Sequence, residues 1–182
     1  KHGVKVIVLE KPLASNISQA REILKLIKRY KTKVLVNHRR RYDKEIIKLK
    51  NSLSKGLIGQ VIQVSCYYVY GLLTTGTHSV DTLRFLFNDI AGEIKTVYGF
   101  KNNFKNFSSS DDKNFDAVLV FKNGLKVTLQ SLDIKSYDNF DFNFFGKKGK
   151  ILITDIGRSI FKYWIQKSVE HSVFTELKQE YS

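Results

Sequence analysis

The chain has 182 residues, of which 42% are hydrophobic, enough for one large domain or two small ones, so wholesale disorder is excluded. Its single cysteine, Cys66, excludes an internal disulfide and a cysteine-built zinc site, and we expect no metal site. No apolar run reaches the roughly 20 residues that cross a bilayer, so we expect no membrane partner and a cytoplasmic location.

Lys and Arg number 31 and Asp and Glu 17, which gives a net charge of +14. Such a charge indicates either a polyanionic partner, such as nucleic acid, or a lysine-rich proteome whose charges are simply scattered. The second interpretation is favoured, because the lysines are dispersed and Asn, Ile and Phe are also plentiful. The chain contains no Met and begins Lys1-His2-Gly3, so we expect it to be part of a longer protein.

The first forty residues predict a strand, a helix and a second strand. Residues 4–9 and 33–36 are nearly continuous β-branched runs, typical of parallel strands buried on both faces. Between them, residues 15–30 have apolar positions at helical spacing, with Ser15 or Asn16 available as the N-cap. Strand, helix and strand at this spacing form a parallel βαβ unit. Residues 1–41 are therefore expected to be the end of a parallel α/β layer.

Residues 42–182 predict a different layer. A helix marked by Ile46, Leu49 and Leu53 ends at Gly56, and a second helix covers residues 77–87. Strands are predicted at residues 60–70, 94–101, 115–121, 125–132, 140–145 and 150–154. Asn123-Gly124 predicts a hairpin with a type I′ turn, residues 102–114 a surface loop, and residues 167–182 a polar tail without a role. The fold class is thus α/β plus α+β, with a largely antiparallel open sheet of five or six strands.

Three short segments contain residues that could carry chemistry. Glu10-Lys11-Pro12 follows the first strand, where open α/β sheets bind ligands, although Lys11 could equally be a surface lysine. His78 follows a glycine-containing turn and could accept a proton, or it could be a polar or capping histidine. Asp81, one turn later, could favour the helix dipole or orient a neighbour. Arg39-Arg40-Arg41 could bind phosphate or carboxylate, or be solvated or paired with local acids.

The order and spacing of these segments resemble a known family. The motifs are Glu10-Lys11-Pro12-Leu13-Ala14, Val36-Asn37-His38-Arg39-Arg40-Arg41-Tyr42, Gly56-Leu57-Ile58-Gly59-Gln60-Val61, Gly76-Thr77-His78-Ser79-Val80-Asp81-Thr82-Leu83-Arg84 and Gly146-Lys147-Lys148-Gly149. Together they resemble the glucose–fructose oxidoreductase / inositol dehydrogenase (Gfo/Idh/MocA) family over residues 4–155. The combination of E-K-P with a downstream G-x-H-x-x-D is more specific than either element alone.

The resemblance implies part of an oxidoreductase that uses NAD or NADP on a sugar, a cyclitol or a sugar nucleotide. Residues 1–41 would be the remnant of a Rossmann nucleotide-binding domain, and residues 42–182 a substrate-binding domain whose open sheet forms a homo-oligomer. Lys11 and His78 would be catalytic, and Glu10, Lys11 and Pro12 would contact the cofactor. Arg40, Thr74, Thr75 and His78 would contact the substrate. A base near the alcohol and a cation near the developing alkoxide are what hydride transfer requires.

Two features depart from the family pattern. The chain contains no G-x-G-x-x-G, so these 182 residues alone are expected to bind a dinucleotide poorly and to be inactive. Thr74 stands where family dehydrogenases commonly have Asp, and its hydroxyl brings no charge to stabilise an imidazolium. The alternative hypothesis is a non-catalytic module that binds anions or nucleic acid through Arg39–Arg41 and exposed aromatics such as Tyr67 and Tyr70, or that only dimerises.

Overall fold

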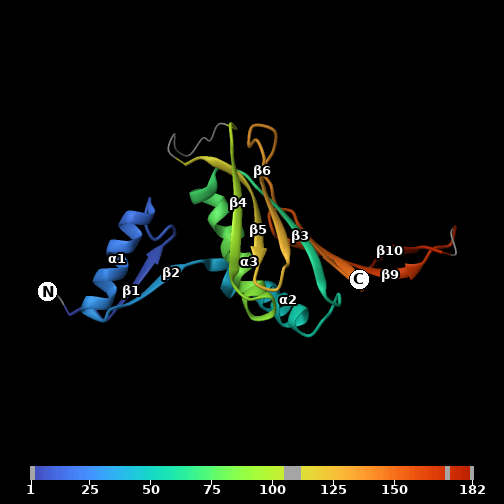
Figure 1. Cartoon of the computed structure of the whole chain (residues 1–182), viewed down its shortest axis with the longest axis horizontal. Coiled ribbons are helices and arrows are strands. Elements are labelled where there is room, and N and C mark those ends of the chain that lie inside the picture. The colour runs from blue at the N-terminus through green and yellow to red at the C-terminus, as the bar shows by residue number, and fades with distance from the viewer. Residues whose placement is uncertain (1–2, 105–111, 171–172, 181–182) are drawn as a thin grey trace.

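The computed structural model describes residues 3–104, 112–170 and 173–180, in two parts (Figure 1). The N-terminal unit comprises strand β1 (Val6–Glu10), helix α1 (Ile17–Tyr30) and strand β2 (Lys33–Asn37). A 3₁₀ turn, η1 (Arg39–Tyr42), leads into an eight-stranded sheet with two long helices. The remaining elements are α2 (Lys44–Ser54), β3 (Val61–Tyr68), the π-helical turn η2 (Leu72–Gly76), α3 (Thr77–Ala91), β4 (Ile94–Asn102), β5 (Asn114–Phe121), β6 (Lys126–Ser131), β7 (Phe140–Gly146), β8 (Gly149–Thr154), β9 (Ser159–Lys167) and β10 (Thr175–Gln179).

The N-terminal βαβ unit forms as the sequence predicts. β1 and β2 are parallel and in register from Val6 opposite Lys33 onward. The side chain of Asn16 caps α1 by accepting a hydrogen bond from the Gln19 amide at 2.9 Å. The expected burial of both strands is wrong, since Val8 is 64% exposed. The reason is that two strands and one helix are all that the described chain supplies to this layer.

The larger sheet has the strand order β10-β9-β8-β7-β3-β6-β5-β4. β3 lies near its centre, antiparallel to β7 and parallel to β6, while the other recorded neighbours are antiparallel. The predicted number of five or six strands is too small. β9 and β10 lie in the segment without a predicted strand, and they form a ribbon that extends away from the rest of the molecule (Figure 1).

The core lies between one face of this sheet and helices α2 and α3. Alternate residues of β7 supply three buried phenylalanines, and each of these side chains contributes about 1.5–3 kcal/mol through burial. The buried helical side chains occur at the helical spacing predicted from the sequence. The main members of the core are Ile46, Leu49, Leu53, Val64, Cys66, Tyr68, Leu83, Leu86, Phe87, Phe121, Val127, Leu129, Phe140, Phe142, Phe144, Ile151 and Ile153.

A close contact between Gly76 and Tyr68 seats the start of α3 against the sheet. Tyr68 is fully buried, and its hydroxyl donates to the Phe115 carbonyl at 2.8 Å and accepts from the Phe115 amide at 3.0 Å. A Cβ at Gly76 would lie 3.0 Å from the Tyr68 ring and 2.9 Å from Leu72. Only glycine therefore lets η2 approach β3 this closely, which fixes the position of the α3 N-terminus.

Within the described ranges, no helix combines the length and apolarity needed to span a bilayer. The segment 102–114 is not simply the predicted surface loop, because Asn102 ends β4, Asn114 begins β5, and both Asp112 and Asn114 are buried. Residues 105–111 of that segment lie outside the described residues.

Candidate functional site

Lys11 connects the N-terminal unit to the start of α3. It lies just beyond the carboxyl end of β1, is partly buried, and donates a hydrogen bond from Nζ to the backbone carbonyl of Thr74 in η2. Beside it, Glu10 Oε1 accepts from Asn37 Nδ2 at 2.8 Å, which joins the ends of the two parallel strands. Pro12 follows Lys11 through a cis peptide bond. The E-K-P segment therefore faces η2, as a site between the two layers requires.

His78 lies in the first turn of α3, four residues after Thr74. Its ring is partly buried and meets the ring of His38 edge-on, with centroids 6.0 Å apart. The Nδ1 atoms of both rings are buried and have no hydrogen-bond partner among the residues that the structure describes. A buried ring nitrogen without a hydrogen-bond partner is unusual in a folded protein, which makes this pair of histidines a candidate for binding a ligand or exchanging a proton.

The surroundings of His78 disfavour its protonated form. The pKa of His78 is lowered to about 4, by burial first and then by the charges of Lys11, Arg40, His38 and Arg39 in that order. The imidazole is therefore neutral at neutral pH, which is the form that accepts a proton.

Asp81 orients Arg41 rather than His78. Its carboxylate accepts two hydrogen bonds from Arg41 in a bidentate pair, at 2.8 Å from Nε and 2.6 Å from Nη2, and one oxygen lies 3.7 Å from His38 Nδ1. Arg41 is thus paired with a local acid, one of the two alternatives for the arginine cluster. The pair ties η1 to α3 across 40 residues, and within the described ranges the other two arginines of the cluster, Arg39 and Arg40, have no ion pair.

Asp112 is the residue of this region that the sequence analysis missed. It is 6% exposed, and it accepts hydrogen bonds from the amides of Leu73 and Thr74, both at 2.8 Å, and from the Thr74 hydroxyl at 2.7 Å. The Thr74 hydroxyl, predicted to contact substrate, is therefore bonded to Asp112, while Thr75 donates its amide to Gly71. Asp112 sits in a polar, serine-rich stretch, and nothing in that pattern distinguishes it from a solvated residue.

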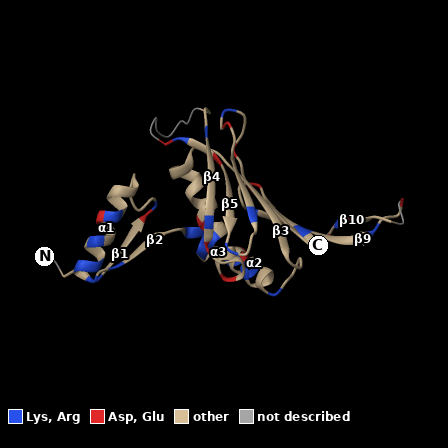
Figure 2. Cartoon of the chain, viewed as in Figure 1, with Lys and Arg blue, Asp and Glu red and all other residues tan. Residues whose placement is uncertain are grey.

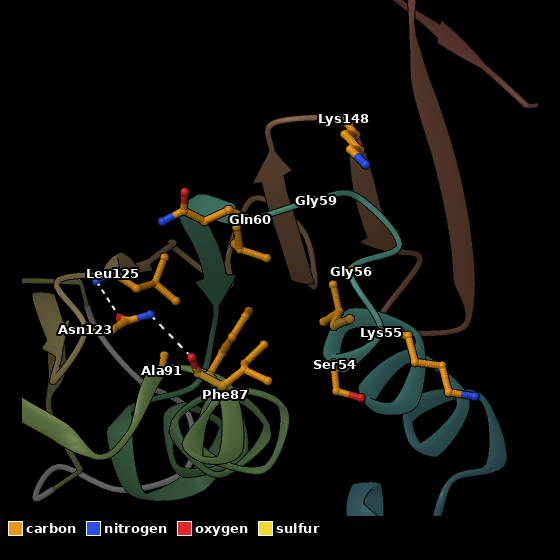
Figure 3. Close-up of a pocket in the computed structure, with 13 residues that line it drawn as sticks. Ser54, Lys55, Gly56, Gly59, Gln60, Phe87, Ala91, Asn123, Leu125 and Lys148 are labelled. Carbon is orange, nitrogen blue, oxygen red and sulfur yellow. Dashed lines mark hydrogen bonds between the residues drawn. The ribbon is translucent and has the colours of Figure 1, made fainter.

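A cavity lies away from these residues. It has a volume of about 480 Å³ and is formed by the ends of α2 and α3, the start of β3 and the β5–β6 turn (Figure 3). The side chain of Asn123 in its wall accepts a hydrogen bond from the Leu125 amide and donates one to the Ile90 carbonyl. The residues that line the cavity include no His, Asp, Glu or Cys. This cavity therefore lacks the carboxylate, imidazole and thiol groups that commonly transfer protons. No group of three or more potential metal ligands occurs in the described part of the chain.

Comparison with known proteins shows which of them share this sequence and this fold. The family model described as "GFO/IDH/MocA C-terminal domain" matches residues 70–152. The Escherichia coli (strain K12) protein YhhX, described as an uncharacterized oxidoreductase, is 24% identical over 166 residues, which are 81% of this chain and 46% of that protein. The chain thus spans about half the length of the curated relative that it matches.

Solved structures share the fold. The WlbA dehydrogenase from Bordetella pertussis, in complex with NADH and UDP-GlcNAcA, superimposes with a TM-score of 0.72 at 16% identity, covering 85% of this chain and 53% of that one. An NAD-binding oxidoreductase from Klebsiella pneumoniae gives 0.72 at 15% identity, covering 97% and 54%. A super-repressor mutant of Gal80p from Saccharomyces cerevisiae gives 0.73 at 14% identity, covering 98% and 54%.

The fold is therefore that of a two-layer α/β plus α+β protein with an open, mostly antiparallel sheet, shared by solved oxidoreductases and by Gal80p. Residues 70–152 match the model of the GFO/IDH/MocA C-terminal domain, which agrees with the resemblance of the sequence motifs to this family.

Proposed function

We propose that this chain is part of a nicotinamide-dependent oxidoreductase that acts on a hydroxyl group of a sugar, a cyclitol or a sugar nucleotide. The observation that carries the proposal is the convergence of Lys11 and His78. Lys11 bonds to the backbone one turn before His78, and its charge lowers the pKa of that histidine. The NADH and UDP-GlcNAcA bound to the WlbA dehydrogenase, which has the same fold, support the cofactor and the substrate class.

The residues present fit one end of a nicotinamide cofactor. Residues 1–41 are proposed as the last part of a nucleotide-binding domain, and residues 42–182 as the substrate-binding and oligomerisation domain. Glu10, Lys11 and Pro12 lie at the carboxyl end of a parallel strand, where α/β sheets bind nucleotides, next to the unpartnered ring nitrogens. The glycine-rich cradle for a pyrophosphate does not occur in these 182 residues, so NAD cannot be distinguished from NADP by them.

Each of the two residues has a separate role in the proposed reaction. His78, neutral at physiological pH, takes the proton of the substrate hydroxyl. Lys11 donates a hydrogen bond to the oxygen and stabilises its developing negative charge, exchanging its bond to the Thr74 carbonyl for one to the substrate. The nicotinamide ring, when bound, accepts the hydride. Thr75 and Arg40 are proposed to hold other groups of the substrate.

The test uses the protein with a complete nucleotide-binding region. We expect a nicotinamide-dependent absorbance change with a sugar or a sugar nucleotide, and the 182-residue chain alone is expected to be inactive. Lys11→Ala and His78→Ala should each reduce kcat by about 10²–10⁴-fold, the range of acid–base contributions. The matched control is Arg21→Gln on the exposed side of α1. Unchanged turnover in both variants would remove these residues from the mechanism.

A binding module without catalysis is the second candidate, because Gal80p, described through a super-repressor mutant, has the same fold. Lys and Arg lie on α1, at the end of β2 and on strands of the sheet rather than on one element (Figure 2), so nucleic acid is the less favoured ligand. A full-length protein that binds NAD(H) and a sugar nucleotide but shows no turnover would support this candidate. RNA binding that weakens steeply with salt would instead support the nucleic-acid alternative.

We also propose that the sheet face opposite α2 and α3 pairs with a second copy. Its central strands present half-buried rather than fully exposed side chains, among them Ser65, Tyr67, Asn143 and Phe145. Gel filtration with light scattering should show a dimer or a larger homo-oligomer, and charged substitution of Tyr67 should dissociate it. A monomer at micromolar concentration would contradict this proposal.

A further inference from the structure

A cavity lined by arginines lies between η1 and the turn that joins β8 to β9. Its volume is about 390 Å³, within the usual range of small-ligand sites. We call it the arginine pocket and define it by Arg39, Arg40, Tyr42, Asp43, Gly157 and Arg158. These residues come from segments more than a hundred positions apart, so the pocket exists only in the folded chain.

Arg40 is held in a fixed orientation in this pocket. Its guanidinium stacks over the ring of Phe140, with the central carbon 3.8 Å from the ring centroid. A Cβ at Gly157 would lie 2.6 Å from Arg40 Nη1, so the backbone of the turn packs directly against the guanidinium. Within the described ranges no acceptor is recorded for the Arg40 N–H groups. A planar, oriented donor fork of this kind matches the geometry of a phosphate or carboxylate.

The β8–β9 turn has an unusual backbone that brings Arg158 to the pocket. Asp155, Ile156 and Gly157 follow one another at positive φ, 54°, 57° and 81°. A β-branched residue such as Ile156 rarely adopts this conformation, which persists only where the surroundings impose it. With this backbone the turn contributes Gly157 and Arg158 to the lining of the arginine pocket.

The pocket has an excess of positive charge. The lining includes three arginines and one carboxylate residue, Asp43, whose side chain already accepts hydrogen bonds from the amides of Glu45 and Ile46 at the start of α2. The only recorded ion pair of Arg158 is with Asp155, at 4.0 Å and largely exposed. Burial and the neighbouring Arg39 both lower the pKa of Arg40, while Asp43 raises it less. A bound anion would relieve this imbalance.

We propose that the arginine pocket binds an oxyanion group, a phosphate or a carboxylate, of the molecule whose hydroxyl reacts at His78. The assignment to the same molecule rests on the proposed function. It follows from position, because His38, which directly precedes Arg39, meets the ring of His78 with centroids 6.0 Å apart. The substrate would therefore be an anionic sugar derivative, with its charged group at η1 and its reacting carbon near Lys11 and His78.

The test measures anion binding to the 182-residue chain without any cofactor, so that its failure leaves the proposed oxidoreductase function untouched. Inorganic phosphate and acetate are titrated separately at low ionic strength and followed by NMR of the arginine side chains. We expect saturable shifts of the Arg40 signals at millimolar anion. Tighter binding of phosphate indicates a phosphorylated substrate, and equal or tighter binding of acetate indicates a carboxylated one.

Two variants locate the site. Arg158→Gln, at an exposed position that cannot disturb the core, and Arg40→Gln should each weaken binding about tenfold or more, as expected for loss of a charge-assisted contact. Arg21→Gln on α1 removes the same charge elsewhere and should leave binding unchanged. Equal weakening by Arg21→Gln would show only a general effect of net charge, and unchanged binding in Arg40→Gln and Arg158→Gln would overturn the proposal.

Discussion

The ammonium of Lys11 donates a hydrogen bond to the backbone carbonyl of Thr74, 63 residues later in the chain. This bond joins the carboxyl end of β1 to the π-helical turn that precedes His78. The same turn donates two backbone amides to the buried carboxylate of Asp112. Hydrogen bonds therefore connect Asp112, the backbone of Thr74 and Lys11 of the N-terminal unit. The charge at Lys11 thereby acts on a histidine that it does not contact through a recorded hydrogen bond.

Removal of the Lys11 charge should raise the pKa of His78. In the native protein that pKa is lowered to about 4, and Lys11 is the largest cause after burial. Loss of a nearby cation stabilises the imidazolium, so Lys11→Ala should move the titration towards 6.5 while Lys11→Arg should not. NMR titration of the His78 ring protons measures this pKa, and the same midpoint in both variants would contradict the electrostatic effect of Lys11 on His78.

Stability should rise with pH between about 4 and 6.5. The folded chain has a His78 pKa of about 4 and the unfolded chain one near 6.5, so within this window the unfolded state binds more protons. The free energy of unfolding therefore increases with pH across the window, and acidification through it destabilises the fold. Urea unfolding at several pH values should show a smaller slope for His78→Gln than for the native chain. A slope that is unaffected by the substitution would assign the dependence to other groups.

The Arg41–Asp81 pair should couple η1 to α3. The bidentate geometry and the low exposure of Asp81, 11% for its side chain, predict a coupling energy of about 1 kcal/mol, larger than for most exposed pairs. A double-mutant cycle with Arg41→Gln and Asp81→Asn measures it through urea unfolding. The exposed Lys48–Glu45 pair on α2 serves as the control, with coupling of about 0.3–0.5 kcal/mol.

Asp112→Asn should loosen the turn before His78. The substitution removes a charged acceptor from the amides of Leu73 and Thr74, which costs about 1–3 kcal/mol for groups of this burial. Hydrogen exchange at these two amides should accelerate by about one to two orders of magnitude for that cost. Asp138→Asn, at an exposed position, is the matched control. Unchanged exchange at both amides would show that Asp112 does not hold the turn.

Gly76→Ala should destabilise the fold by about 1–3 kcal/mol, because the new methyl group would press on Tyr68 and Leu72. Thermal unfolding measures the loss, and a shift of the Tyr68 ring resonances locates it. Gly99→Ala in β4 is the control, since its nearest neighbour would be 4.0 Å away. Equal effects of the two substitutions would indicate helix or strand propensity rather than contact with Tyr68.

Much of the fold is predictable because the apolar pattern of each core element matches its final burial. In β3 the alternate residues Val64, Cys66 and Tyr68 are buried, but Ile62, which continues the same alternation in the sequence, is 53% exposed. The pairing with β7 shifts register between Val61 and Gln63, and this irregularity turns Ile62 away from the core. A local pattern cannot show such a shift, because it depends on the partner strand.

The missed and misjudged elements have physical reasons of the same kind. β10 contains Thr175, Glu176 and Lys178 and has little strand propensity of its own, so it depends on hydrogen bonds to β9. The Asn123-Gly124 hairpin forms as predicted, but the type I′ turn is wrong. Only Gly124 has positive φ, and its amide bonds to the Phe121 carbonyl, which makes a three-residue loop with a bulge.

The sequence motifs predict which residues of the candidate site occur along the chain, but not the hydrogen-bond and ion-pair partners that hold them. Lys11 and His78 follow from motifs at strand and helix ends, whereas Asp112 and the partner of Arg41 depend on which segments meet in space. Their catalytic roles stay predictions. The arginines of the cluster have different partners for the same reason. Arg41 pairs with an acid on α3, and Arg40 stacks on an aromatic ring of β7.

The central place of β3 bears on the order in which the protein folds. Both of its neighbours, β6 and β7, begin more than fifty residues later, while β4–β5–β6 and β7–β8–β9 pair with sequence neighbours. Local hairpins close quickly and distant pairings slowly, so these two meanders should form first and β3 should enter between them afterwards. During synthesis the apolar side of β3 therefore emerges from the ribosome well before β6 and β7, the two strands that it pairs with.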